Sequence, residues 1–326
     1  MTHPFRFCLR NTGGPEVLEA ELIDVPQPGP GEILIRHEAV GLNFIDTYHR
    51  SGLYPLPLPS GVGNEAAGVV EAVGSGVEGF REGNRVGYFS GPLGSYATYR
   101  SIPADRVVKI PDEIGSETAA AILLKGCTAE FLIERCARVE AGETVLVHAA
   151  AGGVGSILVQ WLKSIGAIVI GHAGSSKKAE MVKALGADHA LCCPMEELAG
   201  EVRAITSGKG ASVILDGVGA ASWEASLGSI ARRGLLVTFG NASGPVPAFT
   251  ALDLLRTGSI FVTRPTLFDY TATPEDAQAS AARLFEMVQS GSIEVRIGAR
   301  YPLMKAADAH RALEERKTTG STVLIP

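Results

Sequence analysis

The stretch that decides the fold of this chain is Thr144-Val-Leu-Val-His-Ala-Ala-Ala-Gly-Gly-Val-Gly155. It begins with a short apolar run, residues 145–147, of the kind that forms a buried strand. Small residues follow, and apolar residues then recur at the 3.6-residue period of a one-sided helix. These apolar positions are Val154, Ile157, Leu158, Trp161, Leu162 and Ile165. The stretch therefore predicts a strand, a tight turn and an amphipathic helix, in that order.

The turn at 150–155 has the pattern A-x-G-x-x-G. Small residues there allow a tight turn, a close approach of the backbone to a pyrophosphate, and close packing of the helix on the sheet. The unpaired amides and the positive dipole end of the helix then face the phosphates. A plain Gly-rich connection with no ligand is the alternative. The order of the elements favours a dinucleotide site, to which we assign Ala151, Gly152, Gly153 and Val154.

Length and composition fit a globular protein of two domains. The chain has 326 residues, 46% hydrophobic and 20% charged, and its net charge of −6 argues against a nucleic-acid or anionic-membrane surface. No apolar segment follows a basic start and no run of about 18 apolar residues occurs, so we expect neither a signal peptide nor a membrane span. The five cysteines form no C-x-x-C pair, and we expect reduced thiols in a cytoplasmic protein.

Two kinds of pattern divide the chain. Residues 1–125 contain short runs of partly alternating apolar and polar residues between Gly- and Pro-rich turns, which predict a β-barrel-like domain. A helix at 116–124, the stretch Gly126-Cys-Thr128 and a second helix to Cys136 lead into alternating strands and helices. That alternation predicts a doubly wound parallel sheet in an α/β domain at 126–265. We expect residues 266–326 to return to the first domain.

The acidic residue that holds the ribose of NAD about 20 residues after the glycines is missing. No acid lies between Glu143 and Glu180, and the second strand is followed by Gly174, Ser175 and Lys178. Ser175 and Lys178 are suited to hold a 2′-phosphate by charge-assisted hydrogen bonds, which favours NADP. The alternative is that the lysine is a solvated residue in the first turn of a helix.

The whole order of motifs resembles the zeta-crystallin-type quinone oxidoreductases, a zinc-free group of the medium-chain dehydrogenase/reductase superfamily. The resemblance covers essentially the full length. It is carried by Gly13-Gly-Pro-Glu-Val-Leu18, Asn43-Phe-Ile-Asp-Thr-Tyr48, Ser51-Gly-Leu-Tyr54, His148-Ala-Ala-Ala-Gly-Gly-Val-Gly155, Arg233-Gly, Phe239-Gly-Asn241 and Val262-Thr-Arg-Pro265. It implies a GroES-like catalytic domain, a Rossmann domain, NADPH and a homodimer.

The same resemblance bears on metal binding. Zinc-dependent relatives carry a Cys and a Gly-His-Glu where this chain has Gly41-Leu-Asn43 and Gly63-Asn64-Glu65. Asparagine is a poor zinc ligand, and no cysteine lies between Cys8 and Cys127 to build a four-cysteine zinc lobe. We therefore predict no metal.

The resemblance also assigns site residues. Asn43, Tyr48 and Tyr54 are expected to line the nicotinamide end of an interdomain cleft, with the alternatives that Asn43 only caps a helix and that the tyrosines only pack. Their donors would stabilise charge on an acceptor oxygen. Close relatives differ at Cys193, where they have Tyr, and at Gly217, where they have Ser. The other cofactor-binding assignments are Thr128, Gly152, Gly174, Cys193, Gly217, Phe239, Gly240, Asn241, Arg264 and Arg316. The alternative for Arg316 is an exposed position on the last helix.

The function implied is NADPH-dependent reduction of a quinone without metal. Reduction of an activated alkene such as an enone is a second enzymatic reading. Single-stranded RNA binding is a third possibility, and it would need a basic groove with stacking aromatic side chains. The chain has 6% aromatic residues and a net charge of −6, which argues against this function.

The assembly prediction concerns the last strand of the parallel sheet, expected at 258–263 and at the sheet edge. An apolar edge strand is an aggregation hazard unless it is covered or paired. Pairing with its own copy across a two-fold axis would bury Ile260 and Val262 and form a dimer. The alternative is that the C-terminal return covers the edge and the protein is a monomer.

Overall fold

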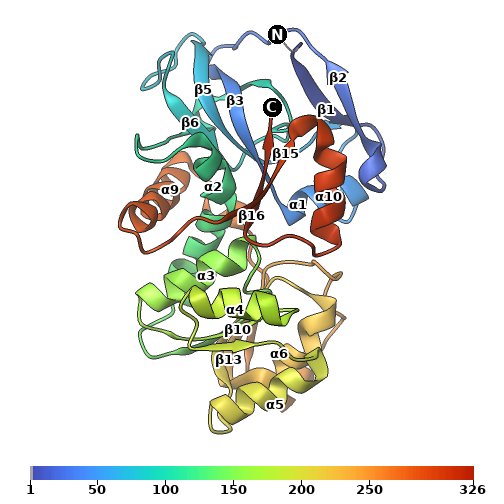
Figure 1. Cartoon of the computed structure of the whole chain (residues 1–326), viewed down its shortest axis with the longest axis vertical. Helices are drawn as coiled ribbons and strands as arrows, with labels where there is room; N and C mark the ends of the chain where they lie inside the picture. Colours follow the sequence, from blue (N-terminus) through green and yellow to red (C-terminus); the bar gives the residue numbers. More distant parts are fainter. Residues whose placement is uncertain (1–2) are drawn as a thin grey trace. The chain divides into compact units, whose positions relative to one another are not determined.

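A computed structural model describes residues 3–326, which form two compact units (Figure 1). The barrel unit comprises the chain through Cys127 together with Thr271–Phe285 and Val295–Pro326. The parallel-sheet unit comprises Thr128–Tyr270 and Glu286–Glu294.

The parallel-sheet unit is a six-stranded sheet in the order β11-β10-β9-β12-β13-β14, with every neighbouring pair parallel. Renumbered along the chain this is 3-2-1-4-5-6, the Rossmann order, which confirms the predicted doubly wound sheet. Its strands are β9 (Thr144–Val147), β10 (Ile168–His172), β11 (His189–Leu191), β12 (Ala211–Asp216), β13 (Ile230–Thr238) and β14 (Phe261–Thr263). Its helices include α3 (Gly153–Ser164), α4 (Ser176–Ala184), α5 (Met195–Ile205), α6 (Trp223–Ser229), α7 (Ala251–Arg256) and α8 (Leu267–Tyr270).

The strand order determines where this unit can bind a ligand. Sequence order reverses between β9 and β12, and ligands of open α/β sheets bind beyond the carboxyl ends of the strands at such a switch point. The central strands are buried on both faces, which explains their continuous apolar runs. Leu146, Ile170 and Ile214 are fully buried in one core cluster with Trp223 and Leu236.

The barrel unit contains two sheets. The smaller has the order β2-β1-β4, and the larger runs β15-β16-β3-β5-β6-β8, with β7 also paired to β3. The strands are β1 (Phe5–Leu9), β2 (Leu18–Leu22), β3 (Glu32–Leu42), β4 (Ser60–Gly61), β5 (Glu65–Val73), β6 (Arg85–Tyr88), β7 (Tyr99–Pro103), β8 (Val108–Lys109), β15 (Ile297–Pro302) and β16 (Ser321–Ile325). Its helices are α1 (Phe44–Ser51), the first part of α2 (Ser116–Glu130), most of α9 (Pro274–Gln289) and α10 (Ala306–Glu314).

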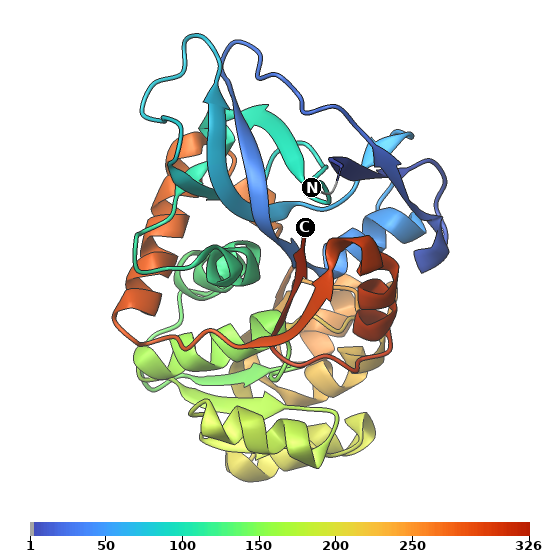
Figure 2. The ribbon, with the colours of Figure 1, turned by 45° about the horizontal axis from the view of Figure 1, so that its top comes forward.

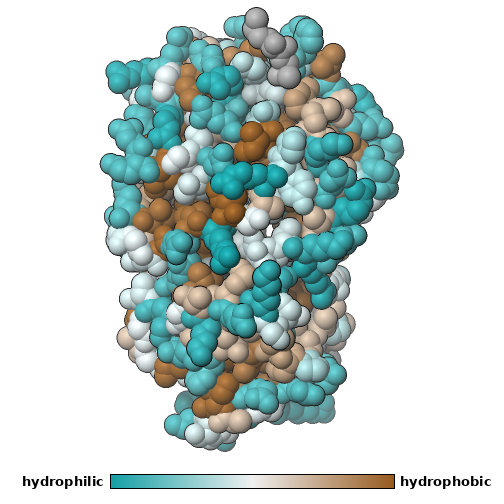
Figure 3. Space-filling view, viewed as in Figure 1, coloured by the Kyte–Doolittle hydropathy of each residue, from teal (hydrophilic) through white to brown (hydrophobic). Residues whose placement is uncertain are grey.

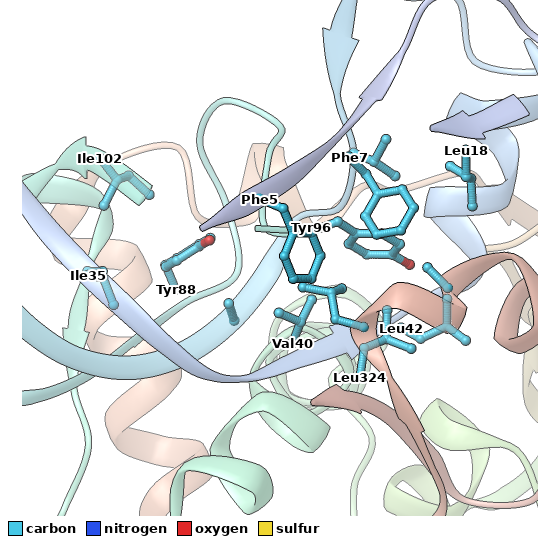
Figure 4. Packing of buried hydrophobic residues seen from close by; sticks show 14 of the residues in the cluster. Phe5, Phe7, Leu18, Ile35, Val40, Leu42, Tyr88, Tyr96, Ile102 and Leu324 are labelled. Atoms are coloured by element: carbon cyan, nitrogen blue, oxygen red, sulfur yellow. The ribbon is translucent and has the colours of Figure 1, made fainter. Parts of the chain in front are cut away.

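The barrel core joins the first and last parts of the chain. Phe5 and Phe7 of β1, Leu42 of β3 and Leu324 of β16 lie in one buried cluster with Tyr96 (Figure 4). The C-terminal strand β16 pairs antiparallel with β3 and parallel with β15, beside which it runs in Figure 2. The end of β3, from which Asn43 follows, is therefore fixed by the last residues of the chain.

The predicted break between two helices at Gly126 is wrong. One helix, α2, runs through this position to Glu130 and continues as a π-helical turn at Phe131–Ala137. A Cβ at Gly126 would overlap the side chain of Leu284, so the glycine serves close packing against α9 instead of ending a helix.

Strand β14 lies at the edge of the parallel sheet, as predicted, but its burial pattern differs from the prediction. Ile260 is 6% exposed and Val262 packs against the same core cluster, so a partner is not needed to bury either side chain. Because side chains alternate along a strand, Phe261 points the other way and is 63% exposed.

Hydrophilic and hydrophobic residues are interspersed over the molecular face shown in Figure 3. Among residues 3–326, no helix is long and apolar enough to cross a membrane.

Candidate functional site

The turn between β9 and α3 has the features that a pyrophosphate requires. Gly152 is the N-cap of α3 in an extended conformation, and the first helical hydrogen bond runs from Ser156 N to Gly152 O. The amides of residues 153–155 precede that bond and belong to the N-terminal turn, where anions bind. A Cβ at Gly155 would overlap the carbonyl oxygen of Ala149, so the glycine lets the helix approach the strand. The predicted residues 151–154 all lie in this turn, and they fit a dinucleotide.

The residues after β10 lie at the start of α4. Ser175 caps this helix, and its hydroxyl accepts a hydrogen bond from the backbone N–H of Lys178 at 3.3 Å. A Cβ added at Gly174 would have open space around it. Ser175 and Lys178 therefore stand in the same helical turn next to an uncrowded backbone, an arrangement compatible with a 2′-phosphate.

Two glycines bring the ends of β12 and β13 close together. A Cβ at Gly217 would lie 2.9 Å from the Phe239 ring, and one at Gly240 would lie 2.5 Å from the carbonyl oxygen of Gly217. A side chain at Gly217 would therefore meet the ring of Phe239. Next to it, the Asp216 carboxylate accepts hydrogen bonds from the Val218 amide at 2.8 Å and from further donors in the following turn and in α6.

The other predicted cofactor residues have different surroundings. Cys193 follows β11, its carbonyl accepts a 3.0 Å hydrogen bond from His172 Nε2, and burial, with nearby Glu201 and Glu197, raises the pKa of its thiol. Thr128 is 8% exposed in α2. Asn241 follows β13. Arg264 follows β14 and is exposed, and its Nη1 donates to the carbonyl oxygen of Pro265. Arg316 follows α10 in the barrel unit and is exposed as well.

The three predicted catalytic residues lie together in the barrel unit. Asn43 is the N-cap of α1, and its backbone N–H donates to the Asp46 carboxylate at 2.9 Å. The rings of Tyr48 and Tyr54 meet edge to face, with centroids 5.2 Å apart, and Tyr54 N donates to Tyr48 O. Asn43 therefore does cap α1, which is the alternative role considered for it. Its side-chain amide makes a separate contact.

The side-chain amide of Asn43 is held by a buried ion pair. Its Nδ2 donates to Glu65 Oε2 at 2.8 Å, and the same oxygen is 3.3 Å from Lys125 Nζ. The other carboxylate oxygen accepts from the Leu124 amide at 2.7 Å. A Cβ at Gly41 would overlap Glu65 Oε2, so the glycine makes room for the carboxylate.

Sequence reasoning missed Lys125. The available signal was a single charged residue inside the otherwise apolar and small-residue run at 118–128, since a lysine is almost never fully buried unless it is paired.

A second buried network joins α1 to α10. Tyr96 Oη lies 3.1 Å from Asp46 Oδ2 and 2.8 Å from His310 Nε2, and His310 Nδ1 is 3.3 Å from Arg50 Nη1. Arg50 also forms an ion pair with Glu314 at 2.5 Å. Asn64 Nδ2 donates to the remaining Asp46 oxygen at 3.3 Å.

The hydrogen-bond directions in this network follow from Arg50. A guanidinium only donates, so His310 Nδ1 accepts and the ring proton of the neutral imidazole lies on Nε2. That N–H donates to Tyr96, whose hydroxyl then donates to Asp46. Burial lowers the pKa of His310 to about 3, and Arg50 contributes, which agrees with a neutral ring. Burial raises the pKa of Asp46 to about 7 despite its hydrogen bonds.

Within the described part of the chain, no group of three or more His, Cys, Asp or Glu side chains is arranged to hold a metal ion. At the positions compared with zinc ligands, Asn43 donates to Glu65 and Asn64 to Asp46.

Two family models match separate parts of the chain. A family model for an alcohol dehydrogenase GroES-like domain matches residues 29–112, and one for a zinc-binding dehydrogenase matches residues 153–285. Together with the Rossmann sheet, these matches define an oxidoreductase class, the medium-chain dehydrogenases/reductases.

A quinone oxidoreductase of Pseudomonas aeruginosa is 49% identical to this chain, over 96% of this chain and 97% of that protein. The crystal structure of Escherichia coli quinone oxidoreductase complexed with NADPH has a TM-score of 0.96 at 44% identity, covering 99% and 100% of the two chains. The 2-haloacrylate reductase of a Burkholderia species is 39% identical over 98% of both proteins. The chain belongs to the quinone oxidoreductase family, which confirms the resemblance.

Proposed function

We propose that this protein is an NADPH-dependent quinone reductase. The observation that carries the proposal is the match, at 49% identity over nearly the full length of both chains, to a protein named quinone oxidoreductase. The NADPH complex of the Escherichia coli relative and the acid-free turn after β10 support the choice of cofactor.

NADPH, when bound, supplies a hydride to the acceptor. In the proposal, the β9–α3 turn binds the pyrophosphate, while Ser175 and Lys178 bind the 2′-phosphate. Asn43, Tyr48 and Tyr54 hold the acceptor ring in a reactive orientation, since fixed geometry is a large part of the catalysis of such a transfer. The proposed functional domains are residues 1–125 with 266–326, and residues 126–265.

The proposed assembly is a homodimer through the edge of the parallel sheet. The support is a group of exposed apolar side chains on β14 and on α7, the preceding helix: Phe261, Leu252 and Leu255 are 63%, 57% and 61% exposed. Exposed apolar side chains on an edge strand and on the helix before it are suited to pairing with a second copy of the same surface. We also propose a cytoplasmic location, which the five free cysteines support.

Reduction of an activated alkene is the second candidate function, because the 2-haloacrylate reductase is similar over the whole chain. The test is the kcat/KM of the purified protein with NADPH for 1,4-benzoquinone, for an enone and for 2-chloroacrylate. We expect the quinone to be preferred by at least about tenfold, which corresponds to about 1.4 kcal/mol of transition-state stabilisation. A preference for either alkene would replace the proposed function with the second one, and no turnover of any acceptor would refute both.

A further inference from the structure

Lys125 is a buried cation with unused hydrogen-bonding capacity. It is 5% exposed, and its ammonium group carries three donor hydrogens. Among residues 3–326, the single acceptor within hydrogen-bonding distance of Nζ is Glu65 Oε2, at 3.3 Å. Buried donors that stay unpaired cost free energy, and those to a charged group are the most costly. Two of the three ammonium hydrogens are therefore left for further acceptors.

Asn43 presents a second donor next to Lys125. One N–H of its amide is bonded to the same Glu65 oxygen at 2.8 Å, and an amide nitrogen has two hydrogens. One carboxylate oxygen thus fixes an ammonium and an amide side by side. The carboxylate is itself held by the Leu124 amide and lies against Gly41, so neither donor needs to reorganise when an acceptor arrives.

The charges around the pair have a defined balance. Glu65 and Lys125 form an ion pair, and the charge of Lys125 also acts on Asp46, where it favours the ionised carboxylate. Tyr96 and the neutral ring of His310 lie on the far side of Asp46. Lys125 is thus a cation that shares a carboxylate oxygen with the Asn43 amide.

We propose that Lys125 donates a hydrogen bond to the quinone oxygen that gains negative charge during reduction, with the second amide hydrogen of Asn43 as its companion donor. Glu65 is the positioning residue for both. The inference rests on the proposed quinone reductase function. A C–H bond of the dihydronicotinamide breaks and the acceptor takes a hydride, that is two electrons and one proton, so the nicotinamide is oxidised and the quinone reduced. The negatively charged acceptor oxygen then takes a second proton from water. Lys125 keeps its hydrogens throughout.

A purely structural role for Lys125, as the counter-ion of Glu65, makes a different prediction from a catalytic one. Lys125→Met alone leaves a buried unpaired carboxylate, which is strongly destabilising. The double variant Lys125→Met/Glu65→Gln removes both charges and keeps an amide beside Asn43 and Leu124. If the lysine only neutralised Glu65, the double variant would regain wild-type kcat. If it stabilises the acceptor oxygen, the double variant stays slow although it is folded.

The experiment compares wild type with the double variant in steady-state reduction of 1,4-benzoquinone and in NADPH binding by fluorescence. We expect kcat to fall about 10²- to 10³-fold, as for the loss of one oxyanion donor, with the NADPH Kd unchanged. A second measurement uses 2-hydroxy-1,4-naphthoquinone, which is anionic at neutral pH, as an equilibrium probe of the donors. Its Kd for the NADP⁺-bound protein should rise about tenfold to a hundredfold in the double variant.

A double variant with wild-type kcat and wild-type affinity for the anionic probe would overturn the role of Lys125 while leaving the quinone reductase function intact. A wild-type protein that reduces no quinone would instead refute the proposed function, and the role of Lys125 with it.

Discussion

Replacing Asp46 with asparagine is expected to remove a pH dependence from the stability of this protein. The carboxyl is fully buried, and burial raises its pKa from 3.8 to about 7 in the folded chain. Because the folded state holds the proton more tightly, its stabilising contribution is complete below pH 3.8 and is lost as the pH rises through about 7.

The size of the effect follows from the shift. Roughly three pKa units at 1.36 kcal/mol each set an upper value of about 4 kcal/mol between pH 4 and pH 7. His310 and His37 oppose this trend, because burial lowers their pKa values to about 3 and about 4 and makes stability rise toward pH 6.5. Both histidines are present in the variant as well, so the difference between wild type and Asp46→Asn isolates the carboxyl.

The assay is urea unfolding followed by circular dichroism at pH values from 4 to 7.5. We expect the free energy of unfolding of wild type, minus that of Asp46→Asn, to fall steadily over this range. Asp253→Asn is the control, since hydrogen bonds from Thr250 lower the pKa of that exposed carboxyl below 3.8. Its contribution to stability is therefore nearly complete at pH 4, and the wild-type minus Asp253→Asn difference should change little over the assay range. A wild-type minus Asp46→Asn difference that stays constant with pH would refute the reasoning.

Four further predictions concern other parts of the molecule. Lys178→Ala should weaken NADPH binding about tenfold to a hundredfold and leave NADH binding unchanged, and equal affinity of wild type for both cofactors would show the assignment to be wrong. Gly41→Ala should lower the free energy of unfolding by about 1–3 kcal/mol, because the added methyl overlaps Glu65, whereas Gly200→Ala in the exposed part of α5 should not destabilise the protein. Phe261→Glu should convert a dimer to a 34.1 kDa monomer in light scattering at micromolar concentration, and a dimer that survives would place the interface elsewhere. Prolonged chelation should leave quinone reductase activity unchanged, and elemental analysis should find well under one zinc per chain; stoichiometric zinc would contradict the prediction of no metal.

The sequence predicted what local patterns encode. The strand, turn and helix at 144–165, the alternation of strands and helices after it, and the cap at Asn43 each depend on neighbours within a few residues. The edge position of β14 followed from its being the last strand. The sequence did not predict that Phe261 would be the exposed side chain of this strand. Alternation fixes only which residues share a face, and the register decides which face is buried.

The polar networks could not be predicted from local patterns. Asn43 and Glu65 are 22 residues apart, Glu65 and Lys125 are 60 apart, and Arg50 and His310 are 260 apart. Such contacts exist only after the sheets have paired, and no periodicity within a single segment encodes them. The helix break at Gly126 was wrong for a related reason, since the partner that requires the glycine, Leu284, is far away in the sequence.

The pairing of β16 with β3 has a consequence for synthesis on the ribosome. The parallel-sheet unit is drawn mainly from one continuous segment, Thr128–Tyr270, so its strands can assemble while later residues are still being translated. The barrel unit needs β16 at Ser321–Ile325, which adds to the sheet beside β3, and Glu314, which pairs with Arg50. Its portion through Cys127 leaves the exit tunnel before the parallel-sheet segment, but its sheet is complete only once β16 has been made. Loss of residues 321–326 from a nascent chain would therefore leave the earlier-made unit unfinished while sparing the unit made after it.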